Sequence, residues 1–360
     1  MVHQEIRDRM GSGGPVRPEL CAGHAAKHRS EFRIGGVSVA VAGRCTEDVT
    51  LVPSLQPFRT EARASDITIQ VEWTERLGPA AGQQVFDSGS LWQLYEDGAE
   101  FQFDFRAPIL GMQSYKRLFV DRQFRRARLQ MSTQCFAGTG YAVAPLEYPL
   151  DELLIMHRLT QEKAIELHSC GIVRPDGTGN LFVGHSGAGK STTTRLWAAR
   201  EDVEVLSDDR IIVRRDEEPP MGTMEMPFRA PDSADGKRIL RLRDRSASPN
   251  GRSAQDDKKK MKMRMYGTPW HGEAAYASPG SAPLARIFIL EHGRGNVLTQ
   301  LSPSQAVAEL FARSFVPFHR YEYVDSALEF LQEMVDAVPC YRYAFEPNEA
   351  AVERILEFRD

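Results

Sequence analysis

Residues 184–191 read GHSGAGKS, and the apolar run NLFVG ends at the first of their glycines. A short apolar run of this kind is typical of a buried strand, and the following STTTRLWAAR predicts a helix. A strand, a glycine-rich loop and a helix in this order form the phosphate-binding loop, whose backbone N–H groups turn inward around the phosphates of a nucleotide. We therefore expect a nucleotide-binding core built on this segment.

Each type of residue in the loop has its own expected task. The glycines supply permissive backbone, and Lys190 would reach the β- and γ-phosphates of ATP as a mobile charge. The hydroxyl of Ser191, or that of the neighbouring Thr192, would ligate Mg²⁺. The expected nucleotide contacts are Gly184, His185, Ser186, Gly187, Ala188, Gly189, Lys190, Ser191 and Thr192.

Two adjacent carboxylates, Asp208 and Asp209, end the apolar run VEVLSDD shortly after the loop. Phosphoryl transfer needs a carboxylate on the magnesium side and a group that orients or deprotonates the acceptor. Two close aspartates can divide these roles, because like charges raise one of their pKa values and so favour a base. An SDD sequence alone would indicate a turn or a helix cap; its place after the loop favours the functional interpretation, with the division of roles left open.

His168 lies on the strand ELHSCGIV (166–173), which is separated from NLFVG by the turn RPDGTGN. This turn is too short for a parallel crossover, so the two strands are expected to form an antiparallel hairpin and the sheet to be mixed. His168 is then either a structural side chain or a neighbour of the aspartates that modulates their protonation.

Composition limits the class of protein. The chain has 360 residues, 42% hydrophobic and 26% charged residues and a net charge of −4. These values are typical of a globular protein with two domains and predict neither a nucleic-acid binder nor a membrane-surface protein. The first twenty residues lack the apolar core of a secretory signal, so we expect a cytoplasmic protein. Its five scattered cysteines predict neither a zinc site nor a disulfide framework.

Three regions follow from the changing pattern along the chain. Residues 1–30 are rich in Gly, Pro and charge and are expected to be a mobile segment, and residues 31–147 read as an antiparallel β-rich domain. Residues 148–360 would form the nucleotide domain, with a polar insertion at about 216–265. Expected strands are 37–43, 65–73, 90–97, 99–107, 116–122, 210–215 and 284–290, and expected helices 148–164, 302–315, 325–337 and 347–358.

Two further patterns have a structural and a functional interpretation. The alternate spacing of the β-domain aromatics favours a core face over ligand stacking; they are Trp73, Trp92, Phe101, Phe103 and Phe105. Between Lys237 and Arg264, eleven basic residues face three aspartates. This stretch is either a solvated insertion or a basic flap that attracts an acidic substrate or nucleotide phosphates.

The combination of GHSGAGKST, LSDD and LHSCGIV resembles the HPr kinase/phosphorylase family, whose nucleotide core is shared with phosphoenolpyruvate carboxykinases. YPLDELL, LSDDR and GTPWHGE resemble, more closely, the HPr-kinase-related proteins. The resemblance implies an α/β fold of α+β character, with a mixed-sheet P-loop core behind the β-rich domain. It also implies ATP- and Mg²⁺-dependent transfer of the γ-phosphoryl group to a hydroxyl, with serine of a peptide or protein as the expected acceptor.

The resemblance also assigns residues. Lys190, Asp208, Asp209 and His168 match the catalytic positions, and Ser191 and Asp209 match the magnesium side. Where this chain has GTPWHGE, the family has a different, arginine-containing motif. Glu273 is therefore a candidate metal ligand, and His271 a candidate phosphate contact, only because of their position in this segment.

Both this departure and the basic insertion lie where a protein substrate would dock, which argues against HPr itself as the acceptor. A small-metabolite kinase and an ATP-sensing module without turnover stay open as alternatives. HPr kinases form hexamers, so a homo-oligomer is compatible with the resemblance, although no residue of the sequence indicates an interface.

Overall fold

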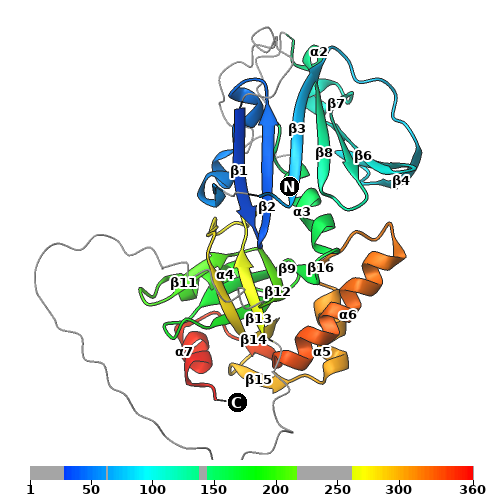
Figure 1. Cartoon of the computed structure of the whole chain (residues 1–360). Helices are drawn as coiled ribbons and strands as arrows, with labels where there is room; N and C mark the ends of the chain where they lie inside the picture. Colours follow the sequence, from blue (N-terminus) through cyan, green and yellow to red (C-terminus); the bar gives the residue numbers. More distant parts are fainter. Residues whose placement is uncertain (1–27, 62–63, 138–143, 217–261, 360) are drawn as a thin grey trace, which may run out of the picture.

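The computed structural model describes residues 28–61, 64–137, 144–216 and 262–359 (Figure 1). The expected N-terminal segment 1–30 and the basic stretch 237–264 lie almost entirely outside these ranges. Two short parts of them are described: a strand begins at His28, and another spans Met263–Gly267, where the sequence predicted irregular chain up to residue 265.

The first part of the chain folds into one eight-stranded sheet, with the order β1-β2-β3-β8-β7-β6-β5-β4. Short 3₁₀ helices lie in its connections: η2 (Glu47–Val49), η3 (Pro53–Phe58) and η4 (Pro108–Leu110). The strands are β1 (His28–Ile34), β2 (Val37–Gly43), β3 (Ile67–Thr74), β4 (Gln83–Asp87), β5 (Trp92–Asp97), β6 (Glu100–Arg106), β7 (Ser114–Asp121) and β8 (Arg126–Ser132).

The prediction of an antiparallel domain is wrong at two pairings of this sheet. β3 pairs in parallel with β2 on one side and with β8 on the other, while the remaining described pairings are antiparallel. The segment between β2 and β3 holds η2 and η3 and is long enough for a crossover. A parallel pair is therefore accessible where the sequence offered only short strands and turns.

Strand β6 shows why this sheet has two different faces. Its sequence EFQFDFR alternates, so Phe101, Phe103 and Phe105 point into the main core and are buried. Trp73 and Trp92 pack against the same core, which confirms the core interpretation of these aromatics. The opposite face of β6 carries Gln102, Asp104 and Arg106 in place of an apolar layer.

The second part of the chain forms a nine-stranded mixed sheet around the expected nucleotide core. As predicted, β9 and β10 are an antiparallel hairpin, whereas β10 pairs in parallel with β14. The strands are β9 (Ala164–Val173), β10 (Gly179–Val183), β11 (Glu204–Ser207), β12 (Arg210–Arg215), β13 (Met263–Gly267), β14 (Ser281–His292), β15 (Val297–Gln300), β16 (Ser314–Phe315) and β17 (Cys340–Phe345).

Strands β9 and β14 are long enough to be shared between neighbours. The first half of β9 pairs with β12 and its second half with β10, and β14 pairs with β13 and then with β10. Since β12 also pairs with β13, the pairings β9–β10–β14–β13–β12 close on themselves. The fold thus contains α and β elements and a mixed sheet, and it is mostly β.

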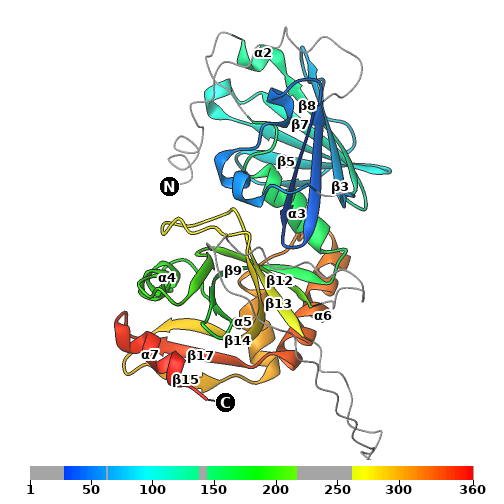
Figure 2. The same cartoon turned by 60° about the vertical axis from the view of Figure 1, so that its left-hand side comes forward.

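Helices cover both faces of this second sheet (Figures 1 and 2). One core cluster joins α5 and α6 to the sheet, and another joins α4 and α7 to its other face. α5 begins with the capping box of Ser302 and Gln305. The helices are α2 (Thr133–Phe136), α3 (Leu150–Leu159), α4 (Lys190–Ala198), α5 (Pro303–Phe311), α6 (Tyr321–Ala337) and α7 (Glu349–Glu357).

α3 and β12 connect the two parts of the chain. The apolar side chains of α3 lie in the core of the first sheet, together with Ile212 of β12. Arg214 of β12 donates to the carbonyl oxygen of Gly35 at 2.7 Å and pairs with Glu162 after α3. α3 therefore lies between the first sheet and the strands that carry the candidate site.

Two further expectations can be compared with the structure. Cys45 is disulfide-bonded, so the cysteines are not all unpaired, whereas Cys135, Cys170 and Cys340 are free thiols. In the described ranges, no helix is both long and apolar enough to cross a membrane.

Candidate functional site

The glycine-rich loop lies between β10 and α4, as the sequence predicts. β10 ends at Val183 and α4 begins at Lys190, with Gly189 as its N-cap. Gly187 and Gly189 have φ angles of 82° and 100°, which side chains other than glycine rarely adopt. A Cβ on Gly189 would also lie 2.6 Å from the Phe345 ring. The sharp turn into the helix therefore depends on glycine.

Lys190 is a buried cation at the start of α4. Its ammonium group donates to the carbonyl oxygens of Gly184 at 3.0 Å and His185 at 3.2 Å. Burial lowers the pKa of Lys190, and the negative charge of Asp209 counteracts part of this effect. Among the described residues, no carboxylate lies within 4 Å of the ammonium group. A buried ammonium without a carboxylate partner suits an anionic ligand such as a phosphate.

The rest of the loop is largely exposed, and two hydroxyl groups follow it in the first turn of α4. His185, Ser186 and Gly187 are exposed, whereas Ala188 is buried against Gly184. The half-buried hydroxyls in the first turn of α4, those of Ser191 and Thr192, form no side-chain hydrogen bond with another described residue. Both are therefore available for a magnesium ion beside the phosphates, and the structure does not choose between them.

Asp208 is buried and bound by backbone on both carboxylate oxygens. It accepts hydrogen bonds from the backbone N–H groups of Gly272 at 3.0 Å, Ala274 at 2.8 Å and Tyr276 at 3.3 Å. Its side chain thus holds the loop 268–276, to which the predicted motif GTPWHGE belongs. The catalytic role of Asp208 stays a prediction.

Asp209 points in a different direction and is half-buried. One of its oxygens lies 2.9 Å from Nε2 of His168, and the other accepts from the Arg210 guanidinium. Burial alone would raise the pKa of Asp209, but the hydrogen bond of His168 and the charges of Arg210, His168 and Lys190 outweigh it and hold the pKa below its ordinary value. His168 and Arg210 are direct cross-strand partners on β9 and β12.

Arg210, which follows the two aspartates in LSDDR, also belongs to this site, although the sequence predicted no role for it. Its guanidinium pairs with Glu152 at 2.8 Å, lies 3.5 Å from Glu166 and stacks over the Phe315 ring at 4.2 Å. Burial and the charge of Glu152 raise the pKa of Glu166 well above its usual range, against the effect of Arg210. Arg210 thus lies among three carboxyl groups, those of Glu152, Glu166 and Asp209.

The loop 268–276 packs over the aspartates through several contacts. Thr268 donates to the carbonyl oxygen of Arg210 at 2.8 Å, and Trp270 donates from its indole N–H to Asp151 at 3.0 Å. Within this loop Glu273 is exposed and His271 is half-buried. The backbone bonds of Gly272 and Ala274, which flank Glu273 in sequence, bring this segment next to Asp208; the metal role of Glu273 and the phosphate role of His271 stay predictions.

A cluster of metal-binding side chains is not present among the described residues of this site: no group of three or more His, Cys, Asp or Glu side chains there could hold a metal ion. Mg²⁺ in phosphoryl-transfer sites is held by one or two protein oxygens together with phosphates and water. The expected metal-side residues are Ser191 or Thr192, Asp209 and the exposed Glu273, and both oxygens of Asp209 are already bound to His168 and Arg210.

Comparison with known proteins gives no family. The chain matches no protein-family model, and no curated protein matches it. Any functional assignment therefore depends on the residues and their geometry.

Proposed function

We propose that this chain is an ATP- and Mg²⁺-dependent phosphotransferase that moves the γ-phosphoryl group to a hydroxyl, with serine of a peptide or protein as the acceptor. One observation carries the proposal. The buried ammonium of Lys190 has no carboxylate within 4 Å among the described residues. The negative charge of Asp209 raises the pKa of Lys190 from a greater distance, and Asp209 is itself bound to His168. This combination offers one cation for phosphates and one oriented carboxylate for an acceptor.

The loop and α4 would hold the donor. The backbone N–H groups at the N-terminus of α4 and the charge of Lys190 bind the β- and γ-phosphates. Mg²⁺ would supply charge neutralisation at these phosphates, with the hydroxyl of Ser191 or Thr192 as its protein ligand. The left-handed Gly189 at the start of α4 and the bond from Lys190 to Gly184 support this arrangement.

Asp209 would orient the acceptor. Its carboxylate accepts the hydroxyl proton while the acceptor oxygen bonds to the γ-phosphorus and the bond to the β-phosphate oxygen breaks. A lowered pKa makes Asp209 a weak base, yet the loose transition state of phosphoryl transfer requires positioning more than proton abstraction. His168 and Arg210 fix the side chain for this purpose.

The test uses the purified full-length chain with Mg²⁺ and ATP labelled in the γ-phosphate. Wild type should transfer label to a serine-containing peptide library, and Asp209→Asn should reduce transfer by about 10²–10⁴-fold while still binding ATP, the range expected for loss of an acid–base group. Lys190→Ala should lose ATP binding itself.

Two results would count against parts of the proposal. Label that goes into a small-molecule extract but into no peptide would make the chain a metabolite kinase. Equal transfer by Asp209→Asn, or ATP binding with no label transferred to either pool, would refute the phosphotransferase and favour an ATP-sensing module.

A further inference from the structure

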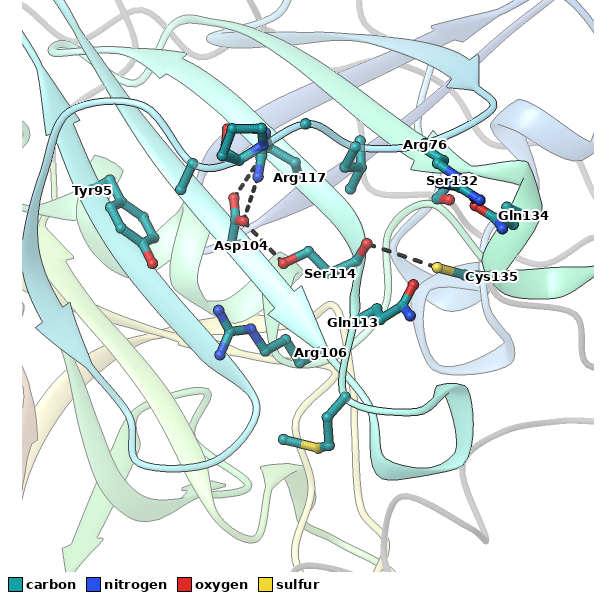
Figure 3. Close-up of a pocket in the computed structure, with 15 residues that line it drawn as sticks. Arg76, Tyr95, Asp104, Arg106, Gln113, Ser114, Arg117, Ser132, Gln134 and Cys135 are labelled. Carbon is teal, nitrogen blue, oxygen red and sulfur yellow. Dashed lines mark hydrogen bonds and ion pairs between the residues drawn. The ribbon is translucent and has the colours of Figure 1, made fainter.

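The first sheet contains a cavity of about 460 Å³ that is separate from the candidate site (Figure 3). Every residue that lines it lies between Arg76 and Cys135, so it belongs to the β-rich part of the chain alone. Figures 1 and 2 show α2 and the neighbouring ends of these strands far from α4. A volume of this size suits a small molecule.

The cavity lies on the sheet face that has no apolar layer. On β6 this face carries Gln102, Asp104 and Arg106, whose cross-strand partners include Tyr95, Arg117 and Ser114 respectively. The same alternation that sends the phenylalanines into the core therefore directs polar side chains into the cavity.

A buried carboxylate organises the floor of the cavity. Asp104 forms a two-point ion pair with Arg117, with both distances at 2.6 Å. It also accepts from Ser114 at 3.0 Å and Gln102 at 2.9 Å. Asp104 is thus fully used by these partners, and its charge is neutralised by Arg117.

Two further arginines of the lining are not neutralised in this way. Arg76 donates to the uncharged side chain of Gln134. Arg106 forms no side-chain hydrogen bond or ion pair with another described residue, and no dashed line joins it to its neighbours in Figure 3. Among the described residues, Asp104 is the one carboxylate of the lining, against three arginines, so the described lining carries an excess of two positive charges. The exposed Asp87 acts on Arg106 from outside the lining.

We propose that this cavity binds a small molecule through a phosphate or carboxylate group, with Arg106 and Arg76 as its counter-charges. A guanidinium presents paired donors that match both anions. The polar floor around Asp104 is already hydrogen-bonded, so binding requires no rearrangement of that side. The inference does not depend on the proposed phosphotransferase function, because none of its residues belongs to the candidate site.

Cys135 provides a direct readout, because its half-buried thiol lines the cavity while the free thiols of Cys170 and Cys340 are buried. Alkylation of Cys135 in the full-length chain is followed by peptide mass spectrometry in chloride, inorganic phosphate or citrate at equal ionic strength. At an anion concentration twice Kd, the rate should fall about threefold, since one third of the cavities stay empty.

Arginine variants make the test specific. Arg106→Gln should abolish the protection, whereas Arg125→Gln, an exposed arginine of the same domain outside the cavity, should retain it. Protection by phosphate or by citrate alone would assign the anion class. Equal alkylation rates in all three salts, or undiminished protection in a folded Arg76→Gln/Arg106→Gln variant, would overturn the proposal.

Discussion

Asp208 and Asp209 are adjacent in sequence, and the structure predicts losses of stability of different size for the same substitution at each. Asp208 accepts three backbone N–H bonds at 2.8–3.3 Å while almost fully buried. In Asp208→Asn, at least one amide would face an NH₂ group instead of an oxygen, and the remaining bonds would lose their charged acceptor.

Hydrogen bonds to charged groups contribute about 1.5–3 kcal/mol each, and an unsatisfied buried donor costs about 1–3 kcal/mol. We therefore expect Asp208→Asn to lower the free energy of unfolding by about 2–5 kcal/mol. Asp209→Asn is the matched control. Its side chain is 23% exposed and pairs with His168 and Arg210. Because it accepts no backbone bond from the loop and Arg210 keeps its pair with Glu152, we expect a smaller loss.

Urea unfolding followed by circular dichroism measures both differences, and hydrogen exchange at the amides of Gly272, Ala274 and Tyr276 reports the loop directly. These amides should exchange faster in Asp208→Asn and unchanged in Asp209→Asn. Equal stability losses in the two variants, or unchanged exchange in Asp208→Asn, would refute the assignment of Asp208 to the loop.

Three other predictions concern pH and the glycine-rich loop. Burial lowers the pKa of His157 to about 3. The stability that the neutral imidazole contributes is therefore present above about pH 6.5 and is lost as pH falls, by about 1.4 kcal/mol per pH unit. In urea unfolding, the free energy of unfolding of His157→Gln should fall less steeply below pH 6.5 than that of wild type, and an equal slope would contradict this. Burial raises the pKa of Asp151 to about 6, so its contribution is present below pH 3.8 and is lost as pH rises through 6; Asp151→Asn keeps an acceptor for Trp270 and should be the more stable protein at pH 7.5, by up to about 3 kcal/mol, but not at pH 4. Gly189→Ala should weaken binding of a fluorescent ATP analogue by about 5- to 150-fold, because the left-handed backbone and the nearby Phe345 ring cost about 1–3 kcal/mol.

Local patterns predicted the hairpin of β9 and β10, the glycine-rich loop and the helix after it, because their determinants are local. The apolar run before Gly184 and the short turn after Val173 fix a strand, a hairpin and a loop within about twenty residues. The parallel pairing of β2 with β3 depends instead on a long connection whose path the sequence does not encode in any short window. The sequence did not predict β13. Met263 and Met265 alternate with other side chains as in a strand, but the many charged residues before them are typical of an irregular insertion.

The candidate site was predicted by residue type but not by role. Sequence placed Asp208 and Asp209 together and could not distinguish them, since the distinction comes from the loop 268–276, which folds back from sixty residues away. Arg210 is part of LSDDR, but its partner Glu152 lies on α3, which precedes the hairpin of β9 and β10 in the sequence. Contacts of this range leave no periodic signal in the chain.

The first turn of α3 links these separate pieces. Asp151 accepts from Trp270 in the loop held by Asp208, and the adjacent Glu152 pairs with Arg210, which contacts Asp209. α3 also packs its apolar side chains into the core of the first sheet. The orientation of both aspartates therefore depends on a helix anchored in the β-rich part of the chain, and that part acts as a structural support of the site as well as the carrier of its own cavity.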